Sequence, residues 1–250
     1  VTGVQTCPLA IFEAFNHMSV RLQDEELRRR RLIADVSHEL RSPLARMRAL
    51  AETIARRPKE AAQHLARIDA EIALMDRLVG DMLDAARLEA GSAEVSCRSI
   101  RLADWAEDAF ERFRRRAEAD GVACAVSVDA GAAEVELDPE RMLQAVGNLV
   151  ENALAAVRGV AAGHIALACR ADSAGVEITV TDNGPGIPEA DLPFVFDRFF
   201  RVERDRGRRS GGVGLGLGIA KAIVEAHHGR LALSPGVEGG IRARIALPVP

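Results

Sequence analysis

The first third of the chain places its apolar residues at the spacing of an α-helix. From Leu32 to Ile54 they fall within a sector of roughly 120° on a helical wheel. From Glu60 to Glu89 they alternate in steps of three and four, which is the spacing of a coiled-coil seam; these positions are Leu65, Ile68, Ile72, Met75, Val79, Met82 and Ala86. Because Pro58 between the two stretches interrupts a helix, the pattern predicts a hairpin of two helices.

A two-helix hairpin with this much apolar surface needs a partner. Dimerisation would join two hairpins into a four-helix bundle and bury the seam of each. Packing of the hairpin against the C-terminal part of the same chain is the alternative. We expect the dimeric bundle because it is the more economical way to bury two long helices.

Beyond Gly91 the spacing changes, and helices alternate with strands. Apolar residues at every second position predict strands. One helix has Asp138 as its N-terminal cap and Pro139 in its first turn. The predicted helices are 103–119, 139–157 and a helix ending near 227, and the predicted strands are 122–128, 165–169, 176–180, a strand near 231, and 241–247. This order indicates a two-layer α/β sandwich after the helical hairpin.

Composition restricts the function classes. The chain has 250 residues and a formal net charge of −4, so we expect no general affinity for nucleic acid. Its cysteines have no metal-ligand spacing, and we interpret them as reduced cytosolic thiols. No apolar run approaches the roughly 20 residues that span a bilayer, so this part is expected to be soluble. Residues 1–8 match no later pattern, which we interpret as a truncated or fused start with upstream segments missing.

A histidine on the first helix is the first candidate for chemistry. With Val36 at the centre of the apolar sector, His38 lies about 200° away and Ser42 about 240° away, so both face solvent. A neutral imidazole is a competent nucleophile near pH 7 because its unperturbed pKa is about 6.5. A single exposed histidine is more often an ordinary surface residue, so this interpretation depends on residues further along the chain.

A carboxylate follows the predicted strand 176–180. Asp182 is in phase with the apolar residues of that strand, so its side chain should point to the buried side. A buried carboxylate needs a hydrogen-bond donor, and the exocyclic amine of adenine would serve. Gly184 and Gly186 would let a flat ring approach the backbone closely. An ordinary turn is the alternative interpretation of these residues.

A glycine-rich stretch and a pair of asparagines complete the candidates. Glycines at alternate positions from Gly212 to Gly218 lead into a helix, whose free backbone amides would line a phosphate. The spacing is neither that of a Walker loop nor that of a dinucleotide fingerprint. Asn148 and Asn152 share one helix face, and amide oxygens are plausible ligands for Mg²⁺. Taken alone, such a pair is often surface.

Together these stretches resemble the motifs of two-component sensor histidine kinases, in the family's order and spacing. SHELRSPL at 37–44 resembles the H box, NLVENA at 148–153 the N box, DNGPGIP at 182–188 the first glycine box, VFDRFFR at 195–201 the F box, and GGVGLGLG at 211–218 the second glycine box. The resemblance implies a HAMP-like relay helix after the irregular start in 1–31, a dimerisation and phosphotransfer domain in 32–91, and a Bergerat-type ATP-binding domain in 97–250.

The resemblance also implies residue roles. His38 would accept the γ-phosphoryl group, Glu39 would orient its imidazole, and Ser42 would position water for removing phosphate from a partner regulator. Asn152 would ligate Mg²⁺, and Asn148 would lie near the phosphates. Further contacts to ATP would come from Asp182, Gly184, Gly186, Ile187, Phe199, Arg201, Gly212, Gly214, Leu215, Gly216 and Leu217, with 183–211 as a lid.

The function implied is that of a sensor kinase core. It would act as a homodimer, autophosphorylate on His38 with ATP and Mg²⁺, and pass the phosphoryl group to an aspartate of a response-regulator receiver domain. It would be the cytoplasmic portion of an inner-membrane sensor, joined to the membrane only through a missing upstream segment. A non-catalytic nucleotide-binding scaffold is the alternative, favoured only by Ala155 and Val213, which replace common family residues. A pure ATPase is disfavoured, because Asn148 stands where ATP-hydrolysing relatives carry a glutamate.

Overall fold

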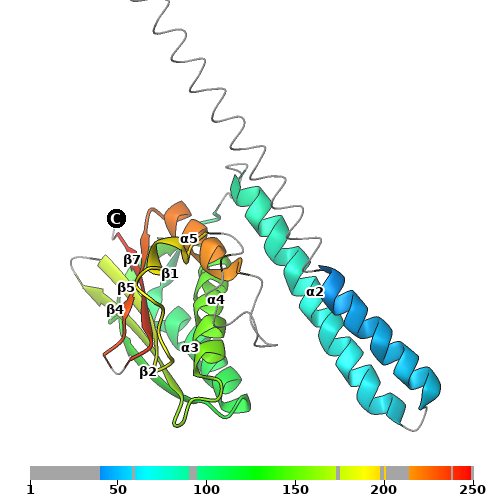
Figure 1. Cartoon of the computed structure of the whole chain (residues 1–250). Coiled ribbons are helices and arrows are strands. Elements are labelled where there is room, and N and C mark those ends of the chain that lie inside the picture. The colour runs from blue at the N-terminus through cyan, green and yellow to red at the C-terminus, as the bar shows by residue number, and fades with distance from the viewer. Residues whose placement is uncertain are drawn as a thin grey trace, which may run out of the picture. The chain divides into compact units, whose positions relative to one another are not determined.

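The computed structural model describes residues 40–57, 60–89, 95–172, 175–197, 200, 214–237 and 239–248. The chain separates into two compact units, Val1–Arg77 and Leu78–Pro250 (Figure 1). Within these residues no helix is long and apolar enough to cross a membrane. The limits expected for the three regions, 1–31, 32–91 and 97–250, remain predictions.

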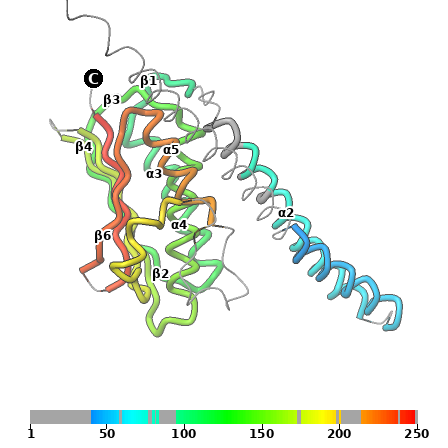
Figure 2. The backbone as a smooth tube through the Cα atoms, turned by 45° about the horizontal axis from the view of Figure 1, so that its top comes forward, coloured from blue at the N-terminus to red at the C-terminus, as the bar shows by residue number. Residues whose placement is uncertain are grey.

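The predicted helical hairpin begins in the first unit, and its second helix continues past Arg77 into the second unit. Residues 40–56 are helical, and α2, Ala61–Glu89, runs back alongside them (Figures 1 and 2). Two backbone bonds close the turn, from the N–H of Arg57 to the carbonyl of Thr53 (2.8 Å) and from the N–H of Glu60 to the carbonyl of Arg57 (3.1 Å). The two helices predicted from the apolar spacing are therefore confirmed over the residues described.

The apolar seam of α2 divides into two rows. Ile68, Met75 and Met82, seven residues apart, are half-buried. Leu65, Ile72 and Val79, also seven residues apart, are exposed by 52%, 45% and 45%. A side chain of this size is stabilised by about 1.5–3 kcal/mol when it is fully buried, so this second row is the surface that the predicted dimer would cover.

The second unit is a five-stranded sheet with helices on one face. The strand order is β2-β4-β5-β7-β6, with β2 and β4 parallel and the other neighbours antiparallel. Figures 1 and 2 show α3, α4 and α5 on the same side of the sheet. The bounds are α3 Leu102–Ala119, β2 Ala123–Asp129, α4 Pro139–Val157, β4 His164–Asp172, β5 Gly175–Asp182, α5 Gly216–Ala226, β6 Arg230–Pro235 and β7 Ile241–Leu247. The predicted two-layer α/β sandwich is confirmed.

Two details of this unit differ from the sequence pattern. Val126 on β2 is 41% exposed, whereas Cys124 and Val128, which share its face of the strand by alternation, are half-buried. β2 is an edge strand that pairs only with β4, so this face is incompletely covered. A second, two-stranded sheet joins β1, Arg98–Arg101, to β3, Glu134–Leu137. Each of these strands has only four residues, too few to show a period.

Candidate functional site

Asp182 is the last residue of β5, and its side chain is buried. Only 7% of the residue is exposed, as its phase with the buried Val176, Ile178 and Val180 predicts. The backbone N–H of Gly184 donates to Oδ1 of Asp182 at 2.8 Å. Burial raises the pKa of Asp182, and hydrogen bonds from the backbone of Gly184 and Ile241 oppose that shift. The carboxylate is therefore held near the helix side of the sheet with little solvation, and a further donor would stabilise it.

Glycines surround this carboxylate at close range. A Cβ on Gly184 would lie 2.8 Å from Oδ1 of Asp182 and 2.9 Å from the Cβ of Ala156, so no other residue fits there without movement. Gly186 has φ +72°, a backbone conformation that favours glycine, and the nearest atom to its Cβ position is a backbone oxygen at 3.5 Å. The loop thus passes tightly over α4 at Gly184, whereas a Cβ at Gly186 would make only an ordinary contact with its neighbour.

The paired helices α4 and α5 bring Asn148 against the glycine-rich stretch. A Cβ on Gly216 would lie 3.6 Å from the Cβ and Cγ of Asn148. Nδ2 of Asn148 is buried and has no hydrogen-bond partner among the described residues. An unpaired buried donor of this kind costs about 1–3 kcal/mol, so an acceptor is expected to meet it.

Gly214 and the start of α5 adjoin that amide. Gly214 has φ +78°, and α5 begins at Gly216. The first backbone bond of the helix runs from the N–H of Ile219 to the carbonyl of Leu215 (2.9 Å). The amides before Ile219 therefore have no acceptor within the helix, and their partial positive charge suits an anion such as phosphate. Leu217 lies in this first turn and is half-buried, while Leu215 is buried.

Asn152 and Ile187 occupy the borders of this region. Asn152 lies one helical turn beyond Asn148 on α4 and is exposed, and Ile187 is half-buried in the loop after β5. An exposed amide oxygen beside an anion site can ligate a hydrated Mg²⁺. Phe199, Arg201 and Gly212 lie outside the described residues, so their predicted contacts to nucleotide remain predictions.

The loop after β5 is anchored at its beginning by Asn183. Its Oδ1 accepts from the N–H of His164 at 2.8 Å, and its Nδ2 donates to the carbonyl of Ala162 at 3.1 Å. Further along, Nζ of Lys221 on α5 lies 5.2 Å from the ring centroid of Phe196, a cation–π distance. The sequence places Asn183 at the start of the predicted lid and predicts neither of these bonds, although an Asn in a turn often bonds to nearby backbone.

A buried polar cluster joins the beginning of α4 to the end of α5. The carboxylate of Asp138 accepts from the N–H of Arg141 (3.0 Å) and from the N–H of Ser96 (2.9 Å). The N–H of Asp138 points to Nε2 of His227 at 2.9 Å, and Nδ1 of His227 lies 2.8 Å from the carbonyl of Ile223. Since a backbone N–H only donates, Nε2 accepts and Nδ1 carries the hydrogen.

The charge state of Asp138 follows from these bonds. Burial alone would raise the pKa of Asp138, but the N–H groups of Arg141, Ser96 and Glu140 hold it below its ordinary value. The predicted N-cap role of Asp138 is confirmed, whereas its bonds to Ser96 and His227 were not predicted.

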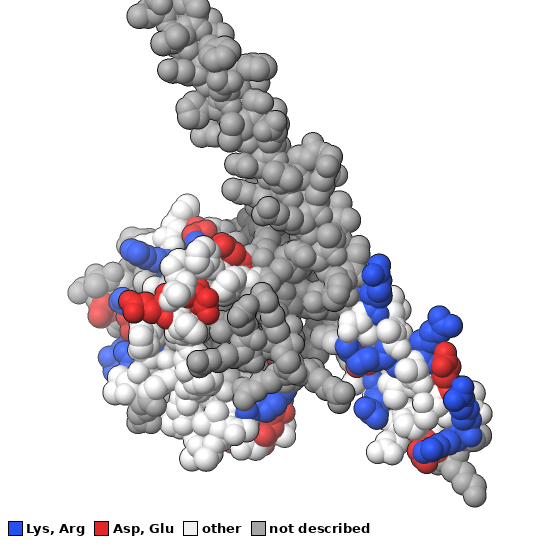
Figure 3. All heavy atoms as spheres, in the orientation of Figure 1, with Lys and Arg blue, Asp and Glu red and all other residues white. Residues whose placement is uncertain are grey.

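Ser42 is the described member of the predicted phosphotransfer residues, since His38 and Glu39 lie outside the described range. Ser42 is exposed, as the helical wheel predicts, and its Oγ lies 2.7 Å from Nη1 of Arg46. Exposed arginines are frequent on this hairpin, one face of which Figure 3 shows. The hydroxyl is therefore open to solvent on one side and held by a cation on the other.

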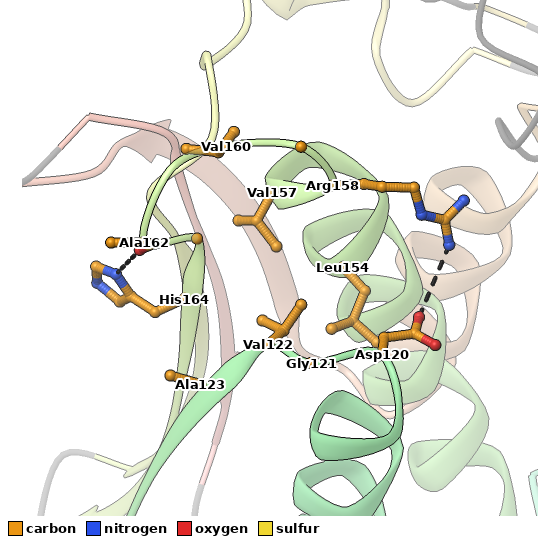
Figure 4. A pocket seen from close by; sticks show the side chains of 12 residues that line it. Asp120, Gly121, Val122, Ala123, Leu154, Val157, Arg158, Val160, Ala162 and His164 are labelled. Carbon is orange, nitrogen blue, oxygen red and sulfur yellow. Dashed lines mark hydrogen bonds and ion pairs between the residues drawn. The ribbon is translucent and has the colours of Figure 1, made fainter.

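A cavity of about 550 Å³ lies elsewhere in the second unit (Figure 4). It is lined by the turn between α3 and β2 and by the loop between α4 and β4, and Nη2 of Arg158 lies 3.7 Å from Oδ2 of Asp120 beside it. None of the residues predicted to bind nucleotide lines it. The candidate site is instead the surface formed by Asp182, the glycines of its loop, Asn148 and the beginning of α5.

Comparison with known proteins agrees with this geometry. The family model described as "Histidine kinase-, DNA gyrase B-, and HSP90-like ATPase" matches residues 137–250, and "His Kinase A (phospho-acceptor) domain" matches residues 28–91. The signal transduction histidine-protein kinase BaeS of Escherichia coli (strain K12) is 32% identical over 94% of this chain. The chain covers 50% of BaeS and so spans about half the length of the curated relatives it matches.

Two solved structures have the same fold. The mycobacterial sensor histidine kinase MprB is 30% identical, with a TM-score of 0.52 over 61% of this chain and 98% of MprB. The histidine kinase ThkA, solved in complex with the response regulator protein TrrA, is 22% identical, with a TM-score of 0.64 over 92% of this chain and 66% of that one.

Proposed function

This chain belongs to the two-component sensor histidine kinases, and from that premise we propose that it transfers the γ-phosphoryl group of ATP to His38. From His38 the group would pass to an aspartate of a response regulator. The observation that carries the proposal is the buried amide of Asn148 beside the first turn of α5, which has no hydrogen-bond partner in the part of the chain that the structure describes. A phosphate oxygen is the acceptor that both the amide and the helix N-terminus would suit.

The residues of the candidate site suit both the adenine and the phosphates of ATP. The carboxylate of Asp182 would accept a hydrogen bond from the exocyclic amine of adenine, and Gly186 would let the ring approach the backbone. Nδ2 of Asn148 and the amides at the beginning of α5 would donate to the phosphates. Mg²⁺ would neutralise phosphate charge, and Asn152 is the residue that we propose as its ligand.

His38 would act as the nucleophile. Its imidazole nitrogen would form a bond to the γ-phosphorus while the bond from that phosphorus to the β,γ-bridging oxygen breaks, and ADP would leave. Glu39 would accept a hydrogen bond from the other ring nitrogen, orienting the ring and stabilising the positive charge that develops on it. Such a transfer depends mainly on alignment and charge neutralisation.

The same site disfavours hydrolysis of ATP. An amide is not a general base, so Asn148 cannot take a proton from an attacking water. A phosphoryl group held there is therefore available to a nucleophile from another part of the protein. The histidine kinases among the relatives favour this interpretation over a nucleotide-binding scaffold.

We also propose a homodimer and a receiver-domain partner. The exposed row Leu65, Ile72 and Val79 supports the dimer, and the response regulator bound to ThkA supports the partner. The chain covers about half of its curated relatives, and we propose that the full-length protein is an inner-membrane sensor whose cytoplasmic part this is.

Incubation of the chain with γ-labelled ATP and Mg²⁺ tests the proposal. A kinase of this type incorporates label that is stable to base and lost in acid, because the phosphorus–nitrogen bond of phosphohistidine is acid-labile. Nucleotide binding without incorporation would indicate a scaffold, and release of labelled phosphate without a labelled protein would indicate an ATPase. Either result contradicts the proposal.

A further inference from the structure

An arginine anchored on the opposite helix holds the hydroxyl of Ser42. Nε of Arg46 lies 2.7 Å from Oε1 of Glu71, and Nη2 of Arg46 lies 2.8 Å from Oε2 of the same carboxylate. Nη1 of Arg46 donates to Oγ of Ser42 at 2.7 Å. The helix 40–56 supplies Ser42 and Arg46, and α2 supplies Glu71, so the contacts cross the hairpin.

The direction of these bonds leaves the serine hydrogen available. A guanidinium has donors and no acceptor, so Oγ of Ser42 must accept from Arg46. The hydroxyl hydrogen then has to find a different acceptor, and Ser42 is exposed on the predicted His38 face of the helix. A bidentate carboxylate fixes the plane of the guanidinium, which in turn fixes where Nη1 meets the serine.

A neighbouring ion pair shows that this arrangement is more than surface charge. Arg48 and Glu52 lie on one helix, with a single contact of 3.3 Å and side chains that are 84% and 61% exposed. Such pairs contribute little. Arg46 instead makes two short bonds to a Glu71 side chain that is only 20% exposed, and it also donates a hydrogen bond to Ser42.

We propose that Arg46, anchored by Glu71, is a positioning residue for the removal of phosphate from the partner regulator. It acts through Ser42, whose hydroxyl it orients so that the hydrogen faces the docked aspartyl-phosphate and its attacking water. In that step water oxygen bonds to phosphorus, the bond from phosphorus to the aspartate oxygen breaks, and the products are inorganic phosphate, a free carboxylate and a proton released to solvent. The inference rests on the proposed function and on the role that the family resemblance implies for Ser42, which is to position water for removing phosphate from the regulator.

The test compares single and double variants of the chain. The probe is a purified receiver domain that accepts phosphate from the parent chain, phosphorylated with acetyl phosphate. Its loss of phosphate is followed with the parent, Ser42→Ala, Arg46→Met, the Ser42→Ala/Arg46→Met double variant and Arg48→Met as matched control. Autophosphorylation is measured in parallel, and the ratio of the two rates is the readout.

The proposal predicts a specific pattern of non-additivity. Ser42→Ala and Arg46→Met should each slow dephosphorylation at least tenfold more than they slow autophosphorylation. The double variant should be no slower than Ser42→Ala alone, because residues that act through one another are not additive. Arg48→Met should stay within twofold of the parent.

Three other results would each contradict a different claim. A further tenfold loss in the double variant, or a normal rate in Arg46→Met beside a slow Ser42→Ala, overturns the positioning role alone. A normal rate in Ser42→Ala overturns the role of Ser42 and this inference with it. Absence of acid-labile label in the parent instead overturns the proposed kinase function.

A charge swap separates positioning from helix packing. The variant Arg46→Glu/Glu71→Arg restores an ion pair across the hairpin but places no donor at position 46 for Ser42. We expect the melting temperature of this double variant to lie closer to that of the parent than the melting temperature of Arg46→Met does, while its dephosphorylation rate stays low. Full recovery of dephosphorylation would show that holding the helices together is sufficient, which overturns the proposal. Arg46→Lys replaces Arg46→Met if the latter does not fold, since one ammonium cannot reproduce the planar fork.

Discussion

Gly216, the first residue of α5, lies directly against Asn148 of α4. A Cβ on Gly216 would sit at an ordinary contact distance, 3.6 Å, from the Cβ and Cγ of Asn148. Alanine is favoured over glycine within a helix by about 1 kcal/mol, so the fold itself would accept a methyl group there. The fold therefore does not require glycine at position 216, and the proposed approach of a phosphate to Asn148 explains it.

Gly216→Ala is expected to keep the fold and lose nucleotide affinity. The methyl group would occupy the space in front of Asn148 where a phosphate is proposed, so the Kd for ATP should rise at least tenfold while the melting temperature stays equal or rises. Titration calorimetry and thermal unfolding measure the two effects. Gly80→Ala, a helical glycine of α2 with no atom within 4 Å of its Cβ position, is the control and should change neither affinity nor kinase activity.

Asp182→Asn should reduce selection for adenine. A hydrogen bond to a charged group contributes about 1.5–3 kcal/mol, so the ratio of ATP to GTP affinity should fall by roughly ten- to a hundred-fold. Competition titrations with the two nucleotides measure that ratio. An unchanged ratio would remove Asp182 from base recognition.

The same substitution predicts a pH dependence of stability. Because burial raises the pKa of Asp182 above its ordinary value of 3.8, the folded state holds this proton more tightly than the unfolded state. The associated stabilisation is complete below the unfolded pKa and is lost as pH rises through the folded pKa. The free energy of unfolding of the parent, relative to Asp182→Asn, should therefore rise as pH falls from 7 toward 4. Urea titrations at several pH values test this, and a relative decrease would contradict it.

Asn152→Ala should weaken the dependence of ATP binding on Mg²⁺. Asn152 is exposed one turn beyond Asn148, where an amide oxygen can reach a hydrated ion beside the phosphates. We expect the gain in ATP affinity on adding Mg²⁺ to shrink at least fivefold, a loss of about 1 kcal/mol for one ligand interaction. Binding of ATP in EDTA serves as the internal control, and an unchanged response to Mg²⁺ would exclude Asn152 as a ligand.

His227→Ala should lower the free energy of unfolding of the second unit and leave its affinity for ATP unchanged. It leaves the buried N–H of Asp138 without its acceptor, which costs about 1–3 kcal/mol. The neighbouring His228 is exposed and has φ +57°, so His228→Asn, which tolerates that conformation, is the matched control. Denaturant unfolding of both variants measures the difference. Equal stability of the two would mean that the Asp138–His227 bond contributes little.

The sequence predicts the parts of this site that depend on local periodicity. Alternation in β5 places Asp182 on the buried side, and the structure confirms its burial. A capping pattern predicts that Asp138 begins α4, which the bond from Arg141 confirms. Both inferences use residues that are close together in the sequence. Within one strand or one helical turn, the spacing between two residues determines whether their side chains point the same way.

The parts that the sequence does not predict join residues far apart in the chain. Ser96 and His227 meet Asp138 across 42 and 89 residues, and Arg46 meets Glu71 across 25. The last contact depends on the register of two antiparallel helices, which the apolar spacing of each helix leaves open. Asn183 bonds to His164 at the start of β4 and to Ala162 just before it, because β4 and β5 pair, and no local pattern contains that pairing.

Labelling of the His38→Gln variant tests the central claim most directly. The parent, His38→Gln and His228→Asn are incubated with γ-labelled ATP and Mg²⁺, and acid-labile label is measured beside ATP affinity. The account predicts label in the parent and in His228→Asn, and none in His38→Gln, whose ATP affinity should stay within twofold of the parent because His38 lies outside the proposed nucleotide site. Acid-labile label in His38→Gln at the parent's level would contradict the assignment of the phosphoacceptor.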